Sequence, residues 1–162
     1  MATGLRLAAS LVLALQLAYG HRVVASEPNV PPDKILPQLA WSFKEPVPAS
    51  VEDLLKQLDA YAKSIKETVN KRELQKVFPG KQLDIQYKYA IQLPTGQWDT
   101  LKVVVRVKER GKPLTYGEIL LQLHQASHQH LKNEDHHYFE GLYRLSRPFE
   151  QGVPAYEVYL GS

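Results

Sequence analysis

Alternation of apolar and polar residues marks two long strands in the middle of the chain. From 83 to 93 every second side chain is apolar, which is the period of a strand with one buried face. A second alternating run follows at 101–108, after a Pro-Thr-Gly-Gln turn at 94–97. A short turn between two such runs predicts an antiparallel hairpin with one solvent-facing side. Two further strands are expected at 138–147 and 155–160.

A different period, about 3.6 residues, predicts two helices. The first begins at Ser50, where Asp53 occupies the capping-box position, and its apolar pattern continues to about Asn70. The second begins at Thr115, again with an acidic residue, Glu118, three positions later. In each pair the side chains can accept hydrogen bonds from backbone N–H groups that the first turn leaves without partners.

The elements therefore follow the order helix, hairpin, helix, hairpin. We expect an α+β domain of order α-ββ-α-ββ, in which two helices pack on one face of a four-stranded, mainly antiparallel sheet. One extra turn of helix is expected around 73–78. The single domain is predicted to span 49–162, because a chain of 162 residues with 44% hydrophobic and 23% charged residues has the length and composition of one globular domain.

The N-terminus has the three parts of a secretory signal peptide. A positive charge at Arg6 precedes an apolar run at 7–17, and the small residues that follow fit cleavage after Gly20. The predicted signal peptide is 1–20, with cleavage after Ala25 as the alternative. The apolar run is too short to span a bilayer comfortably, so we expect no stable membrane insertion once it is removed. The mature protein is predicted to be periplasmic or secreted.

A proline-rich lead at 21–48 separates the signal peptide from the domain. Six prolines fall within 27–48, and this density disfavours helices and sheet ladders and favours extended chain. We expect either a tether or an ordered strap in which apolar residues such as Trp41 and Phe43 contact the domain. The chain has no cysteine, so the exported domain must be stable without disulfides.

Charge argues against nucleic acid as a partner. The chain has 20 basic and 17 acidic residues and a net charge of +3, of which Arg6 departs with the signal peptide. Binding to phosphates requires a concentrated basic face, and no stretch of the sequence supplies one. The expected partner is a protein or a small ligand in the periplasm or the extracellular space.

Five of the six histidines gather between 124 and 137, and this cluster is the most unusual chemical feature of the chain. His124 and His128 are four residues apart on the second helix, so both imidazoles could reach one ion, whereas His130 projects from the other margin. The residues at 135–137 follow the helix and could fold back toward it. The cluster predicts a site for a divalent transition metal, Zn or Cu, with the ligands His124, His128, Asp135, His136 and His137.

Three alternatives use histidine chemistry differently. Five histidines beside carboxylates would titrate at about pH 6 to 7, so the cluster could switch a partner interface with acid. A histidine with Glu134, Asp135 or Glu140 could form a general acid–base pair, although the chain has no glycine-rich phosphate loop, nucleophile elbow or cysteine. Cleavage after Gly20 would expose His21, whose amine and imidazole could chelate copper; in this one residue the chain resembles lytic polysaccharide monooxygenases.

Aromatic residues on the predicted strands supply a candidate binding surface, because exposed tyrosines provide large contact area at low entropic cost. Lys112, just before the second helix, could attract an anionic group to the helix N-terminus. The predicted surface consists of Tyr138, Glu140, Tyr156 and Lys112. We expect a non-enzymatic binding module that uses the sheet face and the histidine-rich end of the second helix. The alternative is a metal-dependent or acid–base enzyme built on the His124–His137 cluster.

Overall fold

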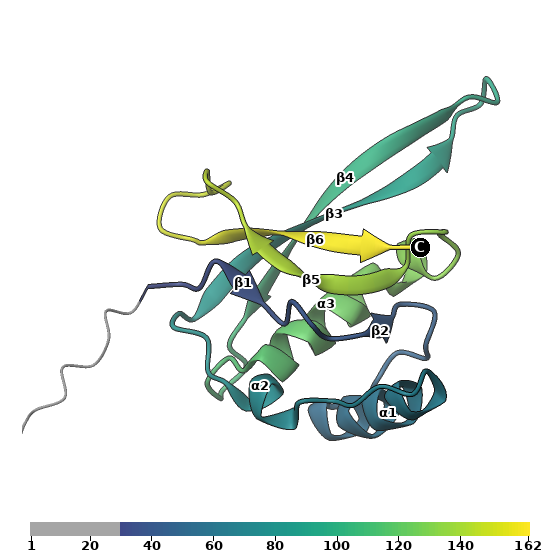
Figure 1. The fold of residues 1–162 in the computed structure, drawn as a ribbon. Helices are drawn as coiled ribbons and strands as arrows, with labels where there is room; N and C mark the ends of the chain where they lie inside the picture. Colours follow the sequence, from purple (N-terminus) through teal and green to yellow (C-terminus); the bar gives the residue numbers. More distant parts are fainter. Residues whose placement is uncertain (1–29) are drawn as a thin grey trace, which may run out of the picture.

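The computed structural model describes residues 30–162, in which the helices lie on one side of a layer of strands (Figure 1). The elements in chain order are β1 (Lys34–Ile35), β2 (Trp41–Ser42), α1 (Val51–Ser64), α2 (Lys71–Gln75), β3 (Gln82–Gln92), β4 (Trp98–Lys108), α3 (Tyr116–Leu131), β5 (Tyr138–Arg144) and β6 (Ala155–Gly161). The predicted α+β class is confirmed. The predicted signal peptide, both cleavage positions and His21 lie outside the described residues.

The sheet differs from the prediction. Within residues 30–162 it contains six strands, in the order β1-β5-β6-β3-β4 with β2 also paired to β5, and three helices accompany it. The sheet is mixed, because β3 and β6 run parallel while the other pairs are antiparallel. The predicted four-stranded, mainly antiparallel sheet with two helices is therefore wrong. Alternation reports which face of a strand is buried, but it does not report which strand lies beside it.

Both predicted helix starts are present. The Ser50 hydroxyl accepts a hydrogen bond from the Asp53 backbone N–H at 3.1 Å, and the Thr115 hydroxyl accepts one from the Glu118 backbone N–H at 3.2 Å. Each cap has extended backbone, as an N-cap requires. These local signals were sufficient because a cap depends only on residues within one turn.

The first helix is shorter than its apolar pattern suggests. α1 ends at Ser64 rather than near Asn70, and Lys66, two residues later, has a left-handed φ of 61°, which no α-helix continues through. The chain then forms the five-residue α2 at Lys71–Gln75 in place of the turn expected at 73–78. No helix within residues 30–162 is long and apolar enough to cross a membrane.

The strap, residues 30–48, is an integral part of the domain. Its strands β1 and β2 both pair with β5, and Ile35, Trp41 and Phe43 are completely buried. Of the two alternatives for this segment, the structure has the ordered strap, and the core begins well before the predicted boundary at residue 49. Strands of two residues are too short to show alternation, so the pattern could not reveal them.

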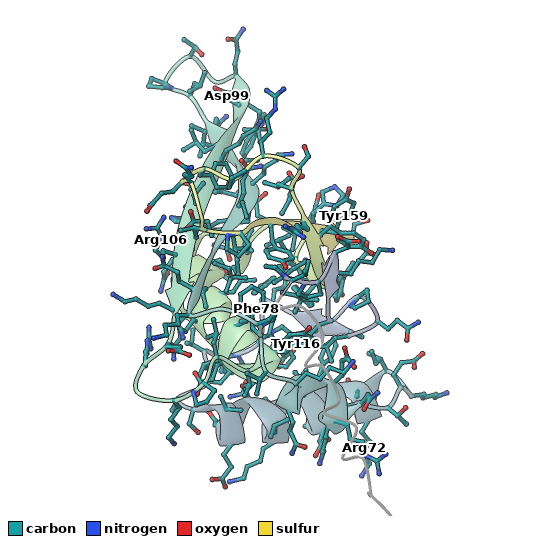
Figure 2. All side chains as sticks on the ribbon, turned by 90° about the vertical axis from the view of Figure 1, so that its left-hand side faces the viewer. Arg72, Phe78, Asp99, Arg106, Tyr116 and Tyr159 are labelled. Carbon is teal, nitrogen blue, oxygen red and sulfur yellow. The ribbon has the colours of Figure 1, made fainter. Side chains whose placement is uncertain are left out.

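The β3–β4 hairpin extends far beyond the rest of the sheet. All of β3 pairs with β4, whereas its pairing with β6 is confined to residues 84–86 against 155–157. The distal half of the hairpin therefore diverges from β6 (Figure 1). Asp99 lies near the far end of this projection in Figure 2, at the opposite end of the molecule from Arg72 of α2. The divergence of β3 from β6 leaves the cleft described next.

Candidate functional site: the cleft between β3 and β6

Helix α3 distributes its histidines over two sides. His124 and His128 contact the strap, whereas His130 contacts β3. This distribution follows from the helical rotation of about 100° per residue. His124 and His128 are four residues apart and therefore lie on one side, whereas His130, two residues after His128, lies on the other. We name these the strap side and the hairpin side of α3.

The strap side is a closed aromatic environment. Trp41 Nε1 donates a hydrogen bond to His124 Nδ1 at 3.1 Å, and His124 is 0% exposed. The rings of Trp41 and Phe43 meet the imidazole edge to face, with centroids 5.5 Å and 5.4 Å away. Burial, with a smaller contribution from the neighbouring His128, lowers the pKa of His124 to about 4. His124 is therefore a neutral core residue at physiological pH and has no contact with solvent.

The two strap-side imidazoles also meet each other. Because Trp41 donates to Nδ1 of His124, the proton of the neutral ring lies on Nε2, which is 3.3 Å from His128 Nδ1. The same His128 nitrogen lies 3.0 Å from the backbone oxygen of Phe43. Within residues 30–162, no group of three or more histidine, aspartate and glutamate side chains is arranged to hold a metal ion. The structure thus brings together two of the five predicted metal ligands, fewer than a protein zinc site requires.

The hairpin side of α3 is more open. The Tyr87 hydroxyl is 2.6 Å from His130 Nδ1, and the Tyr89 ring stacks on the imidazole with centroids 4.3 Å apart and an interplanar angle of 2°. Burial raises the pKa of Tyr87 to about 12, so its hydroxyl keeps its proton and shares a hydrogen bond with the imidazole. These contacts fix the Tyr89 ring in the inner wall of the cleft.

The turn between α3 and β5 forms the end of the cleft. His137 is buried, and its Nδ1–H donates to the backbone oxygens of Glu134 and Asp135 at 2.9 Å and 2.8 Å. A histidine that closes a turn in this way has no role as a metal ligand through that nitrogen. The closed turn directs Glu134 and the exposed His136 to the cleft.

The cleft itself lies where β3 and β6 separate. It has a volume of about 470 Å³ and is lined by two strands on its long sides, by β4 and by the α3–β5 turn. The lining residues are Lys88, Tyr89, Ala90, Thr100, Glu134, His136, Glu157, Val158, Tyr159 and Leu160. Tyr159 is half exposed, and its ring packs against that of Tyr143 on β5, with centroids 4.3 Å apart. The cleft thus joins the sheet to the C-terminal end of α3.

Backbone groups of β3 face into the cleft. Odd-numbered residues of β3 bond to β4, as the Leu93 N–H to Gln97 oxygen bond of 2.7 Å shows, so even-numbered residues direct their backbone groups to the other edge. Where β3 and β6 are still paired, this edge is hydrogen-bonded: the Asp84 N–H donates to the backbone oxygen of Pro154, just before β6, at 2.9 Å. Farther along, the Ala90 N–H donates instead to a carboxylate oxygen of Glu134 at 3.2 Å.

The charged groups of the cleft are largely arranged on its outer side. Lys88 Nζ lies 2.6 Å from a Glu157 carboxylate oxygen, which also accepts a hydrogen bond from Gln86 at 3.2 Å. Glu134 and His136 stand at the end of the cleft. An apolar inner wall with a few polar groups at its rim is typical of ligand sites in proteins.

The four residues of the predicted binding surface do not lie together. Tyr138 is 39% exposed beside His137, and Glu140 is exposed on the same strand, β5. Tyr156 is 0% exposed and donates a hydrogen bond to the Pro32 oxygen at 2.6 Å, so it belongs to the core and the strap and its assignment to a surface is wrong. Lys112 is exposed before the first turn of α3, about 24 Å from the cleft end of that 16-residue helix.

Most residues of the cleft were missed by the sequence analysis. Lys88, Tyr89, Glu157, Tyr159 and Leu160 were assigned to strands, but nothing in their spacing indicates that two strands far apart in the sequence lie in parallel and then separate. The tyrosines could have indicated this binding surface, because the alternating pattern placed several of them on the last predicted strands. His136 was identified from its cluster and does lie in the cleft.

No family model, no curated protein and no solved structure matches this chain. The chemical capability of the site therefore follows from its own geometry. It offers aromatic and aliphatic surface, one ion pair, one exposed imidazole and a row of backbone groups along a strand edge. These groups can hold a ligand by apolar contact and by hydrogen bonds.

Proposed function

We propose that this chain is an exported binding module whose ligand site is the cleft between β3 and β6. The observation that carries the proposal is the early end of β3–β6 pairing at Gln86–Glu157, beyond which both strands continue and a space of about 470 Å³ separates them. The sheet and the turn that follows α3 supply the lining of this cleft, and His136 of that turn belongs to the histidine cluster.

The state of the histidines favours binding over catalysis. His124 and His137 are buried and hydrogen-bonded, so neither can reach a substrate. His136 is exposed in the cleft, but among residues 30–162 no carboxylate is hydrogen-bonded to it as the orienting partner of a general base. The remaining protein groups that line the cleft can hold a ligand by apolar contact and hydrogen bonds, which favours a binding site.

Photo-crosslinking tests the site. The full chain, expressed in its source organism with benzoylphenylalanine in place of Tyr159, is expected to form an adduct of defined mass on irradiation. The matched control carries the same group in place of Ala60, which is exposed on α1 and remote from the cleft. An adduct at Tyr159 and none at Ala60 supports the proposal. No adduct at Tyr159, or equal adducts at Tyr159 and Ala60, contradicts it.

Export is tested separately. The protein recovered from the periplasm or the medium is expected to begin at His21 or at Ser26, according to which of the two cleavage positions is used. Recovery of a chain that still begins at Met1, from the cytoplasm alone, contradicts export. That result would not bear on the proposed ligand site in the cleft, which the photo-crosslinking experiment tests.

A further inference from the structure

We propose that the cleft binds an extended peptide segment, which adds to the free edge of β3 as an extra strand. This inference rests on the proposed function, since it names the class of ligand that the same site takes. Three features support it: a strand edge that has no neighbouring strand among residues 30–162, a carboxylate that binds one donor of that edge, and cleft walls that differ in chemistry on the two faces of the sheet.

The strand edge is long enough for a peptide. Pairing with β6 ends at Gln86, and β3 continues to Gln92. Over these six residues the backbone groups of Lys88, Ala90 and Gln92 point to the cleft side, because the odd-numbered residues bond to β4. Six residues of strand span roughly 20 Å, which is the length of an ordinary strand. Peptide ligands that join a sheet use open edges of this kind.

Glu134 occupies the place of the missing strand. Its carboxylate accepts a hydrogen bond from the Ala90 N–H at 3.2 Å, a donor that a neighbouring strand would pair with a carbonyl oxygen. Its other carboxylate oxygen makes no hydrogen bond or ion pair to another residue within 30–162. A peptide carbonyl can take over the Ala90 N–H, and the released carboxylate then stands free to pair with a basic side chain of the ligand.

The walls of the cleft indicate the side chains of the ligand. Tyr89, Val158 and Leu160 lie on the core side of the sheet and present apolar surface. Lys88, Glu157 and Tyr159 lie on the outer side. Because successive side chains of a strand point to opposite faces, the matching peptide has apolar residues at every second position. The position of Glu134 adds a lysine or arginine to this pattern.

A random peptide library tests the inference. Phage that display linear octapeptides are selected on the full-length protein, and a synthetic peptide of the enriched sequence is titrated calorimetrically. We expect the alternating apolar pattern with a lysine or arginine. Ala90→Pro removes the N–H that faces the cleft and is expected to weaken binding by at least about tenfold, the effect of losing one or two hydrogen bonds and blocking the edge. Glu134→Gln is expected to weaken it about threefold or more.

The matched control is Lys102→Pro. Lys102 lies opposite Lys88 in the hairpin, and its N–H points away from β3 along the outer edge of β4, where proline is tolerated. This variant is expected to bind the peptide like the wild type. In the wild type, bound peptide is also expected to slow hydrogen exchange at the Lys88 amide, which a ligand held by side chains alone would not do.

Each contrary result has a distinct meaning. Failure to enrich any peptide overturns the inference, and so does a peptide that Ala90→Pro binds as tightly as the wild type. If the Tyr159 crosslink forms in either case, the cleft still binds a ligand and only the strand-addition mode is overturned. If the crosslink is also absent, both proposals fail together.

Discussion

On the strap side of α3, His124 is enclosed between Trp41 and Phe43, whereas on the hairpin side His130 stacks on Tyr89, a wall of the open cleft. The strap side is closed because residues 30–48 cover it and pair with β5. The hairpin side stays open because β6 leaves β3 after Gln86. The same residue type thus supports the core on one side of a helix and borders a candidate ligand site on the other.

The comparison teaches that a cluster in the sequence is not a cluster in space. Five histidines fall within fourteen positions, and four of them were predicted, together with Asp135, to bind one metal ion. The structure divides them among a contacting pair at 124 and 128, of which His124 is buried and His128 is partly exposed, a stacked ring at 130, a cleft residue at 136 and a turn-closing residue at 137. The packing partners of each ring, rather than the spacing of the histidines, decide what it can do.

The largest expected effect is on the closed side. Trp41→Ala removes a completely buried ring and the donor to His124, so we expect it to lower the free energy of unfolding by about 3–5 kcal/mol in urea denaturation. Trp98→Ala is the matched control, because Trp98 is 70% exposed on the projecting hairpin and should change stability by no more than about 0.5 kcal/mol. Equal losses in the two variants would show that the strap does not close the core.

The second largest effect is expected from low pH, which should lower the stability through His124 on the strap side of α3. The pKa of His124 is about 4 in the folded chain against about 6.5 when unfolded, so the unfolded state takes up the proton first. Stability from this residue is complete above about pH 6.5 and is lost as the pH falls to about 4, by roughly 3 kcal/mol. The measurement is the free energy of unfolding as a function of pH across this range, for the wild type and for His124→Asn. The dependence of this free energy on pH should be weaker in His124→Asn. Identical slopes in the two proteins would refute the assignment.

A smaller effect is expected on the open side. Tyr87→Phe removes the hydroxyl that is hydrogen-bonded to His130, and should lower the free energy of unfolding by about 1 kcal/mol, the usual contribution of one such hydrogen bond. The control Tyr159→Phe removes a solvent-facing hydroxyl and should leave thermal stability unchanged. A loss in Tyr87→Phe as large as in Trp41→Ala would mean that the two sides of α3 are equally closed.

The smallest expected effect is that of added zinc. The strap side brings two imidazole nitrogens within 3.3 Å but supplies no third ligand within residues 30–162. We therefore expect calorimetric titration with zinc or copper at neutral pH to detect no sub-micromolar site in the described domain. The double variant His124→Ala, His128→Ala should behave like the wild type. One tight site that disappears in the double variant would restore the predicted metal centre.

Several features could be predicted because they depend on neighbours in sequence. Ser50 and Thr115 cap their helices through residues three positions away, and the turn at 94–97 joins two alternating runs that pair along their whole length. The candidate site could not be predicted in the same way. Its walls come from 88–90, from the turn after α3 and from 157–160, and they meet only through the parallel pairing of β3 with β6.

The sequence by itself determined the α+β class, the two helix starts, the long hairpin and the side-chain face that this hairpin buries. These depend on local hydrogen bonds and on the 2- and 3.6-residue periods, which act over a few positions. Only the tertiary structure decided that β6 lies beside β3, that the strap encloses His124 and that a cleft opens after Gln86. Such pairings are chosen by the combined burial of all the elements, and no single segment contains the information for them.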